Sequence, residues 1–293
     1  MWQAVFVRDA LLRAHSGLHI ELVGITTEGD RTLDVPLAEK GGKGLFLKEL
    51  EQALLDGRID LAVHSMKDVT VTEPDGLHIP VICEREDPHD ALVSTRFGDL
   101  RELPDGAVVG TCSLRRQSLL RYRFPQLKVE NLRGNVNRRL QRLDDGDFDA
   151  IILAAAGLLR LQMAGRIRQR IPTGIMLPAV GQGAVGVQCR ADDAKTTSLL
   201  APLDHVPTHA RITAERAANV HLGGGCHLPI GAFAEIEGEQ LRLRGLVGRP
   251  DGSNILFASA KGLVSEAEAV GHTLADDLLG QGAKALLQEF ANA

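Results

Sequence analysis

The first two thirds of the chain alternate short apolar runs with segments of helical periodicity, and this alternation limits the fold more than any other feature. Runs 61–63, 107–109, 127–129 and 150–153 have the length and composition of buried strands. Helical patterns separate these runs along the chain. Short apolar strands joined by helices indicate sheets that are mainly parallel and covered on both faces. We therefore predict an α/β fold for this part.

Further elements follow from the same periodicities. Apolar residues at helical spacing predict helices over 3–14 and 44–56, a third that begins at Ser113, and a fourth near 136–143. The run 18–23 is typical of a strand.

The pattern changes after Leu203, which predicts a separate C-terminal domain of roughly 90 residues. A helix is expected first, then an antiparallel sheet in which the last two strands have hairpin spacing around a turn at 249–252. Two more helices close the chain. The predicted helices are 210–222, 266–279 and 283–290, and the predicted strands are 231–236, 241–247 and 255–260.

Composition narrows the classes of partner. The 293 residues carry a net charge of −5, and only 3% of them are aromatic. A nucleic-acid binder needs a basic surface, and single strands also need stacking rings, so this class is disfavoured. The four cysteines show no metal-ligand spacing, and no run has membrane-spanning length or the pattern of a signal peptide. We expect a cytoplasmic protein with reduced thiols, no membrane association and a small anionic substrate.

The first candidate station is the polar segment 64–68, directly after a predicted buried strand. Ligands of open α/β sheets gather at the carboxyl ends of strands. Asp68 could therefore act as a general acid or base, or stabilise a developing cation. The alternative is a structural carboxylate that caps a turn beside Lys67, and position alone does not decide between the two.

Two further stations are rich in arginine and also follow predicted strands. Arg115 and Arg116 lie at the start of a helix for which Ser113 is the candidate N-cap, and Arg133 and Arg139 follow the next strand. Helix N-termini and guanidinium groups both bind carboxylates or phosphates. The alternative is a solvated charged face, although arginines in a first turn oppose the helix dipole. Two such stations at equivalent strand ends favour a substrate with several carboxylates.

The most unusual loop holds three consecutive glycines followed by Cys226. A thiol on such a loop can be approached closely by a large group, whereas the alternative is a small apolar residue in a tight turn. Glycine-rich loops at 41–44 and 181–184 match neither a P-loop nor a dinucleotide fingerprint. A nucleotide cofactor is therefore unsupported, and no metal is expected.

Taken together and in this order, these segments resemble the porphobilinogen deaminase family, also called hydroxymethylbilane synthases, of tetrapyrrole and haem biosynthesis. The resemblance covers nearly the whole chain. The matching segments are 26–30, 41–51, 64–69, 110–117, 132–136, 151–158, 177–186, 214–217 and the Cys226 loop.

The resemblance implies three domains. Two are lobes like those of periplasmic binding proteins, with the active cleft between them, and the third is a C-terminal α+β domain that anchors a cofactor. The expected limits are 1–83 with 184–203 for the first lobe, 84–183 for the second and 204–293 for the third.

The resemblance also implies a transferase chemistry. A dipyrromethane cofactor would be joined to the sulfur of Cys226 by a thioether. Porphobilinogen would lose ammonia to give an azafulvene, which the free α-carbon of the terminal pyrrole attacks. After four rounds, hydrolysis would release hydroxymethylbilane from what we expect to be a monomer.

Site residues carry over by matching position. Asp68 matches the family's catalytic carboxylate, which stabilises cationic pyrrole intermediates and handles protons. Ser113, Arg115, Arg116, Arg133 and Arg139 match residues that hold the acetate and propionate groups of cofactor and substrate, while Lys43, Lys67 and Gln182 match further positions in or near the cleft.

This sequence departs from the family pattern in three places. Thr70 stands where a proline is usual, and Glu39 stands where a lysine is common. Family members also have a short N-terminal segment with an Arg-Lys-Ser-like motif, which would supply a central strand and cleft residues, whereas this chain begins at Met1. A mis-set start or a truncation would explain this, and we expect such a chain to fold poorly or be inactive.

Two rival interpretations remain open at this stage. One is a two-lobed receptor for a small polycarboxylate, in which Cys226 is incidental. The other is a truncated, inactive relative that keeps the fold without the chemistry.

Overall fold

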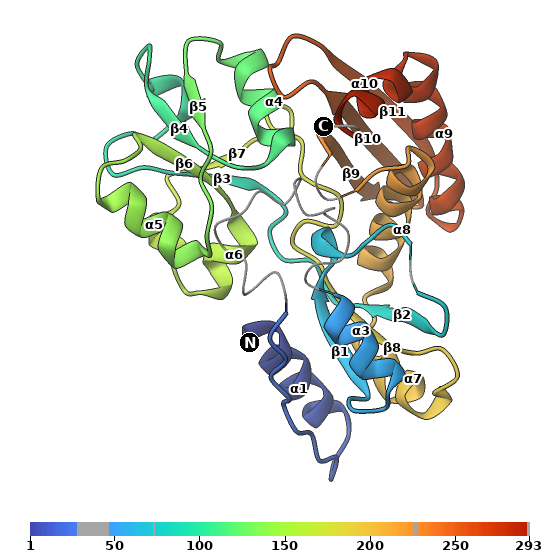
Figure 1. The fold of residues 1–293 in the computed structure, drawn as a ribbon. Helices are drawn as coiled ribbons and strands as arrows, with labels where there is room; N and C mark the ends of the chain where they lie inside the picture. Colours follow the sequence, from blue (N-terminus) through green and yellow to red (C-terminus); the bar gives the residue numbers. More distant parts are fainter. Residues whose placement is uncertain (28–46, 73, 226–227, 292–293) are drawn as a thin grey trace.

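The computed structural model describes residues 1–27, 47–72, 74–225 and 228–291, and three sheets organise them (Figure 1). The sheets have strand orders β1-β8-β2, β5-β4-β6-β3-β7 and β11-β10-β9. Their strands are β1 Leu61–Ser65, β2 Leu77–Ile82, β3 Asp90–Val93, β4 Val108–Gly110, β5 Lys128–Glu130, β6 Ala150–Ala154, β7 Gln169–Ile171, β8 Val185–Arg190, β9 Ile230–Glu237, β10 Gln240–Gly248 and β11 Ile255–Leu263.

Most helices lie where the periodicities predicted them, within a few residues at each end. The helices are α1 Trp2–Ala14, α3 Lys48–Leu55, α4 Leu114–Arg123, α5 Val136–Asp144, α6 Ala155–Arg160, α7 Ala194–Leu200, α8 Val206–His221, α9 Ala267–Gly280 and α10 Ala283–Ala291. In the described ranges, no helix is both long enough and apolar enough to cross a bilayer.

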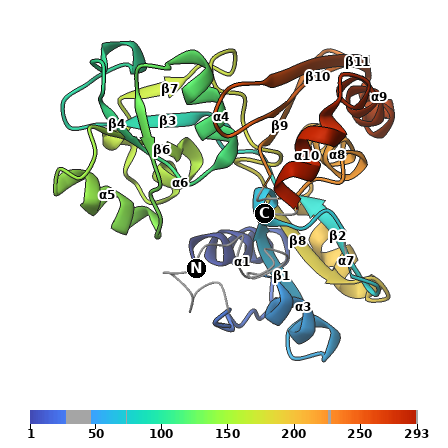
Figure 2. The same ribbon diagram turned by 45° about the horizontal axis from the view of Figure 1, so that its top comes forward.

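The first sheet mixes distant parts of the chain. β8 lies between β1 and β2 and runs antiparallel to both, so the two outer strands run parallel to each other. β8 follows the whole second sheet in sequence, so the chain leaves this lobe after β2 and returns to complete its centre (Figures 1 and 2). This return places Ala184 directly beside the end of β1, where Met66 N–H donates to its carbonyl at 3.0 Å.

Residues 18–23 do not form the predicted strand: they join no ladder in the described sheets. A strand needs a backbone partner, and none of the described strands pairs with this segment. Leu18 and Ile20 instead pack their side chains against the cluster that contains Val7 of α1 and Val187 of β8. The apolar pattern of this segment therefore reflects packing rather than pairing.

The second sheet shows the expected parallel pairing at its centre. β4 runs parallel to β5 and β6, whereas β3 runs antiparallel to β6 and β7. Alternate residues of its strands enter two cores: Leu92 packs with α4, and Ala91 packs with α5 and α6. Both faces are therefore covered at the centre of the sheet, which is why β3, β4 and β6 are mainly apolar, whereas the edge strands β5 and β7 carry charged residues.

The third sheet is an antiparallel meander with β10 in the middle. One face packs on α8 and α9 in a large apolar cluster. From the other face, Phe233 and Leu246 enter the core that contains α4 of the second lobe. The predicted class, α/β lobes with mixed sheets followed by an α+β domain, is confirmed. The lobe sheets are not mainly parallel as predicted, because among their described strand pairs only β4–β5 and β4–β6 run parallel. We propose the domain limits 83/84, 183/184 and 203/204, because each described sheet takes its strands from one of the resulting domains. The first lobe supplies β1, β2 and β8, the second supplies β3–β7, and the C-terminal domain supplies β9–β11.

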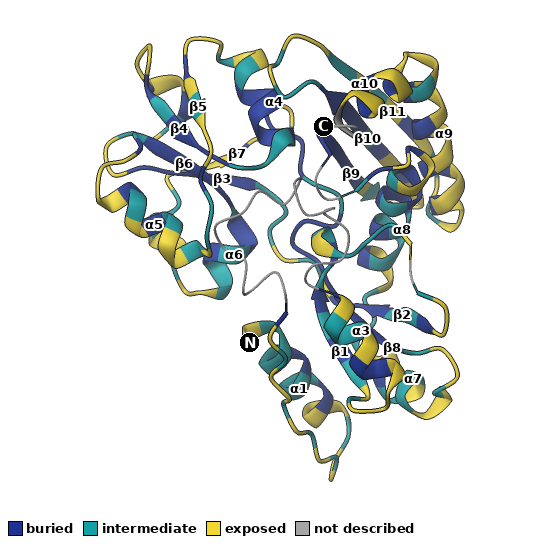
Figure 3. Cartoon of the chain, viewed as in Figure 1, coloured by how far each residue is buried: buried dark blue, intermediate teal, exposed yellow. Residues whose placement is uncertain are grey.

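Burial distinguishes the covered strands from the exposed helix faces (Figure 3). In α5, for example, Leu140 and Leu143 are buried at a spacing of three residues, while Asn135 caps the helix by accepting from Arg138 N–H at 2.9 Å.

Candidate functional site

The carboxyl end of β1 carries a short turn, η1 (Met66–Asp68), that presents two charged side chains. Met66 is buried under this turn, Lys67 is half-buried and Asp68 is exposed. In the described part of the chain, the Asp68 carboxylate accepts no hydrogen bond of the kind a turn cap would make. A buried Met66 thus fixes the turn while leaving Asp68 accessible.

Lys67 lies in the field of charges from both lobes. Its pKa is lowered from the ordinary value: the adjacent Asp68 carboxylate opposes this shift, but loss of hydration and the charges of Arg116 and Arg139 outweigh it. The Asp68 charge also acts on Arg139. The structure therefore brings the first and the two arginine stations into one electrostatic neighbourhood.

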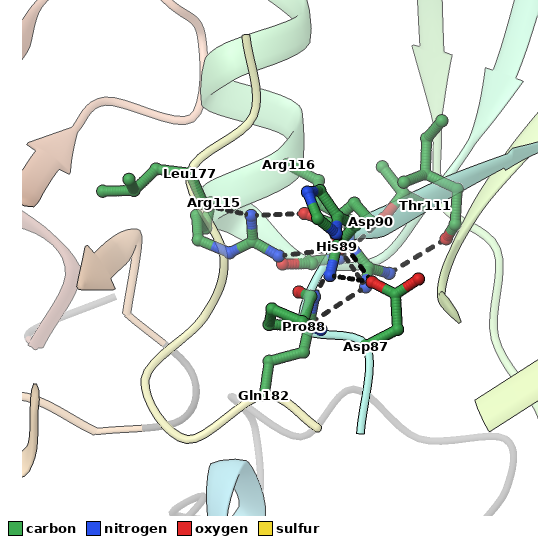
Figure 4. Close-up of polar contacts among 11 residues, drawn as sticks. Asp87, Pro88, His89, Asp90, Thr111, Arg115, Arg116, Leu177 and Gln182 are labelled. Carbon is green, nitrogen blue, oxygen red and sulfur yellow. Dashed lines mark hydrogen bonds and ion pairs between the residues drawn. The ribbon is translucent and has the colours of Figure 1, made fainter. Parts of the chain in front are cut away.

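Arg115 and Arg116 both bind the carboxylate of Asp90 (Figure 4). Arg115 donates to the two oxygens of Asp90 at 2.7 and 3.2 Å and also to the Leu177 carbonyl. Arg116 donates from Nε to Asp90 Oδ1 at 2.9 Å and from Nη1 to the Ile152 carbonyl at 2.9 Å. These contacts fix both arginines of α4 to the first residue of β3.

The two arginines are only 2% and 6% exposed, so the alternative of a solvated charged face is wrong for them. Burial alone would raise the pKa of Asp90, but the charges of Arg115 and Arg116 hold it at about 2. Two guanidinium groups thus share one carboxylate, which leaves a net positive charge in the cluster. The Nε of Arg115 is buried with no hydrogen-bond partner in the described structure.

Gln182 completes this cluster from the segment that leads back to the first lobe. Its side chain is buried, donates to the Pro88 carbonyl at 2.7 Å and to Asp90 at 3.1 Å, and accepts from Arg116 at 3.4 Å. Gln182 and Pro88 belong to the two segments by which the chain crosses between the lobes. The cluster therefore sits at the junction of the lobes.

Arg139 is the arginine of the third station that approaches this cluster. Its Nη2 donates to the sulfur of Cys112 at 3.8 Å, and its Nε is buried without a partner among described residues. Burial lowers its pKa, and the charges of Arg116 and Arg133 act in the same direction. These like charges are unfavourable together, which is typical of a site that binds anions.

Ser113 occupies the N-cap of α4 as predicted, but its side chain makes no capping bond. Its N–H instead donates to the hydroxyl of Thr111 at 3.2 Å. The Ser113 hydroxyl is therefore not used to cap the start of α4.

The loop that follows Asp68 is held by two hydrogen bonds. Thr70 donates its hydroxyl to the Thr72 carbonyl at 2.8 Å, and Arg216 of α8 donates to the Thr70 carbonyl at 3.2 Å.

Sequence reasoning missed Arg160, the last residue of α6. It lines a cavity of about 290 Å³ together with Lys67 and Trp2. Its Nη2 donates to the Gly183 carbonyl at 2.8 Å, its guanidinium lies 5.5 Å from the Trp2 ring centre, and burial lowers its pKa. Arg160 follows the apolar strand β6 as Asp68 follows β1. This position in the sequence could have identified Arg160 as a candidate site residue.

Asp90 was also missed. A carboxylate that opens the apolar run 90–93 must be buried, and a buried carboxylate needs a cation. That requirement was visible in the sequence, but its partners lie 25 and 26 residues away on α4.

A second buried ion pair joins the lobe junction to the C-terminal domain. Arg85 Nη1 lies 2.6 Å from Glu215 Oε1 of α8, and both side chains are nearly inaccessible. Glu215 also accepts from Gly181 N–H at 2.8 Å and from Ala234 N–H of β9 at 2.9 Å. One carboxylate thus fixes both crossing segments to α8 and β9.

Cys226 and Lys43 lie outside the described residues, but the structure describes the flanks of the Cys226 loop. α8 ends at His221, and Gly223 adopts a φ of +65°, which few residues other than glycine accept. Gly224 lies so close to Asn219 and Ile230 that a side chain would displace them. Beyond the loop, Leu228 N–H donates to the Gly225 carbonyl at 3.1 Å.

Among the residues with assigned positions, no group of three histidine, cysteine, aspartate or glutamate side chains is arranged to hold a metal ion. The charged side chains of the candidate site are one exposed carboxylate and a set of cations. These are Asp68, Lys67, Arg116, Arg133, Arg139 and Arg160.

Comparison with known proteins identifies two matching family domains. Residues 1–198 match the domain described as "Porphobilinogen deaminase, dipyromethane cofactor binding domain", and residues 209–280 match "Porphobilinogen deaminase, C-terminal domain". Together the two matches cover most of the chain.

Three similar solved structures have low sequence identity to this chain. A periplasmic substrate-binding protein of an ABC transporter from Coxiella burnetii is 15% identical, with 69% of this chain and 86% of that chain covered and a TM-score of 0.43. A nutrient binding protein from Burkholderia cenocepacia bound to methionine is 15% identical, with 68% and 86% covered and a TM-score of 0.42. The periplasmic VFT2 domain of BvgS from Bordetella pertussis is 19% identical, with 68% and 74% covered and a TM-score of 0.37.

Proposed function

Since this chain belongs to the porphobilinogen deaminase family of tetrapyrrole biosynthesis, we propose that it is a hydroxymethylbilane synthase that joins four porphobilinogen molecules on a dipyrromethane held by Cys226. The reaction forms a methylene bridge between two pyrroles and releases one ammonia per bridge. Hydrolysis then frees the linear tetrapyrrole. We take the protein to act as a cytoplasmic monomer without a nucleic-acid or membrane partner.

The residues around Asp68 fit a group that bears several carboxylates. Lys67, Arg116 and Arg139 repel one another electrostatically, and the Nε of Arg139 is buried without a partner in the described structure. Such an arrangement is stabilised when carboxylates bind, because guanidinium groups pair with them in bidentate geometry. Each pyrrole of substrate and cofactor carries an acetate and a propionate, so the need for cations grows as the product lengthens.

Arg133, Arg139 and Ser113 would hold these acidic side chains from the second lobe, and Lys67 and Lys43 from the first. Arg115, Arg116 and Gln182 would act from the junction between the lobes. Arg115 has its terminal nitrogens bound to Asp90 and the Leu177 carbonyl, so only its unpartnered Nε is free for a ligand.

Asp68 would act on the reacting pyrrole. When porphobilinogen loses ammonia, positive charge develops on the pyrrole nitrogen, and an adjacent carboxylate stabilises that charge. When the new carbon–carbon bond forms, the attacking terminal pyrrole must lose the proton of its α-carbon, and the same carboxylate can accept it. The bound dipyrromethane supplies the free α-carbon at which the chain is extended.

The observation that best supports this proposal is the position of Asp68. It is the exposed carboxylate of a turn fixed by Met66, and it lies in the field of Lys67 and Arg139. The cationic intermediate requires an adjacent carboxylate, and Asp68 is the exposed carboxylate that this turn presents.

The test is ammonia release from porphobilinogen by the purified chain and by Asp68→Asn. The amide can neither accept the proton nor stabilise the cation as well, so we expect kcat to fall about 100-fold or more. Asp75→Asn is the matched control, because Asp75 is an exposed aspartate on the same connection between β1 and β2. Its rate should equal that of the unmodified chain.

Two results would count against the proposal. Equal rates for the Asp68 and Asp75 variants would remove Asp68 from the chemistry. Porphobilinogen binding without any ammonia release would instead favour a polycarboxylate receptor.

A further inference from the structure

A second cavity lies between the second lobe and the C-terminal domain, away from the candidate site. Its volume is about 430 Å³, within the range of small-molecule sites. One wall comes from α4 and residues 173–177, and the other from β10, β11 and α9. It shares no lining residue with the cavity beside Lys67 and Trp2.

The lining divides into an apolar part and a polar part. Leu119, Ile175 and the ring of Phe257 form an apolar surface. Phe257 also packs against Tyr122 with ring centres 6.2 Å apart, and both rings are partly exposed at the same edge. In a chain with only 3% aromatic residues, this pair of exposed rings marks the cavity as a surface suited to a flat apolar group.

Two arginines supply positive charge to the cavity. Arg244 of β10 donates to Thr173 at 2.8 Å and to Glu235 at 2.9 Å, but its Nε is buried and has no partner in the described residues. Arg123, at the end of α4, is exposed and forms no ion pair or hydrogen bond within the described structure. Both guanidinium groups line the cavity and favour the binding of an anion in it.

Asp277 of α9 also lines the cavity, and an anion is disfavoured beside its carboxylate. Charge therefore orients any ligand. An acidic group is favoured beside Arg123 and Arg244, and an uncharged ring is favoured against Phe257. The hydroxyl groups of Thr173 and Ser259 offer further hydrogen bonds.

We propose that this cavity is a binding site for a small aromatic anion, a compound of one or two rings with one carboxylate or sulfonate. Such a ligand contacts both the second lobe and the C-terminal domain, so it stabilises their packing. It would also contact Leu177, whose carbonyl accepts from Arg115 of the junction cluster.

The probe is 8-anilinonaphthalene-1-sulfonate, whose emission rises when its rings leave water. We expect saturable binding to one site on the native chain. Arg123→Gln should weaken binding roughly fivefold, because an exposed charge contributes up to about that factor. Arg13→Gln is the control, since Arg13 is another exposed arginine at the end of a helix.

A second variant blocks the space itself. Gly174 lines the cavity, and a Cβ built there meets no atom within 4 Å, so Gly174→Leu fills space without a clash at the backbone. We expect at least a tenfold loss of probe affinity. Gly165→Leu is the control, because Gly165 is likewise exposed and unobstructed but lies in a short 3-10 helix, η3 (Ala164–Arg166), that does not line this cavity.

Thermal melts of all four variants establish that each is folded before the titrations are compared. Unchanged probe affinity in both Arg123→Gln and Gly174→Leu would overturn the proposal. Equal weakening by Arg123→Gln and Arg13→Gln would also overturn it, because binding would then follow net charge rather than this cavity.

Discussion

Arg115 and Asp90 form a two-pronged ion pair that is closed off from solvent, with donor–acceptor distances of 2.7 and 3.2 Å and exposed side-chain fractions of 3% and 0%. The pair fixes the start of β3, which follows the crossing from the first lobe, to the first turn of α4. Arg116 shares the same carboxylate at 2.7 Å. A single aspartate thus compensates two buried cations at the junction of the lobes.

Asp90→Asn should therefore destabilise the fold strongly. The amide keeps the shape of the side chain but leaves two buried guanidinium groups without a counter-charge, and we expect a loss of about 3 kcal/mol or more in the free energy of unfolding. Urea denaturation followed by circular dichroism measures this loss. Asp105→Asn, at an exposed turn, should change stability by less than about 0.5 kcal/mol. Equal midpoints for the two variants would contradict the role assigned to Asp90.

His64 should make the free energy of unfolding depend on pH. Its side chain is 4% exposed and bonds to Gln188 at 3.0 Å, and burial lowers its pKa from 6.5 to about 4. Between pH 4 and pH 6.5, His64 therefore binds a proton more readily in the unfolded chain than in the folded chain. Stability from His64 is fully present above about pH 6.5 and is lost as pH falls towards 4.

Between pH 7.5 and pH 5 this loss amounts to about 2 kcal/mol. His64→Gln keeps a partner for Gln188 but does not titrate, so its free energy of unfolding should fall less over the same range. The measurement is a series of urea titrations of both proteins across this pH interval. Parallel pH profiles for the two chains would contradict the buried, neutral state of His64.

Local pattern predicted most of the elements but not their pairing. The helix expected over 136–143 is α5, and the strand expected over 150–153 is β6, because apolar periodicity records which face is buried. Residues 18–23 show the limit of that reasoning, since an apolar run in extended backbone cannot reveal whether a partner strand is present. The insertion of β8 between β1 and β2 depends on a return of the chain that periodicity does not encode.

For the candidate site as well, the sequence predicts which residues belong to it but not how their charges pair. Asp68 and the arginines could be identified because they follow strands, and ligand sites in α/β sheets gather there. Their charge balance could not be predicted. Asp90 binds residues 25 and 26 positions away. Arg160 and Lys67 meet at one cavity although they come from different lobes and are 93 positions apart in the sequence.

The only tryptophan of the chain should report ligand binding in that cavity. Trp2 is 42% exposed and lines the cavity with Lys67 and Arg160. A bound carboxylate compound excludes water from the indole, so its emission should shift to shorter wavelength when porphobilinogen is added. Lys67→Gln should reduce the shift at a given concentration, whereas Lys128→Gln, on exposed β5, should not. An emission maximum that stays constant at saturation would contradict the placement of the ligand here.

The conformation of Gly223, in the loop before Cys226, can be tested separately by substitution. Gly223→Ala places a side chain at a φ of +65° and should cost about 1 kcal/mol of stability. Gly280→Ala, at the end of α9 with no atom within 4 Å of the new Cβ, should be neutral or slightly stabilising. Thermal melts of the two variants compare these effects. A Gly223 variant as stable as the Gly280 variant would show that the loop does not need this conformation.

The central proposal is that Cys226 carries the cofactor on which the product grows. Intact mass spectrometry of the protein purified from cells supplied with porphobilinogen tests it most directly. We predict that the chain without substitutions carries an added mass equal to two porphobilinogen molecules less two ammonia molecules. This added mass should be absent from Cys226→Ser and present in Cys112→Ser. An unmodified mass for the native chain, or an adduct that survives in Cys226→Ser, would contradict the proposal.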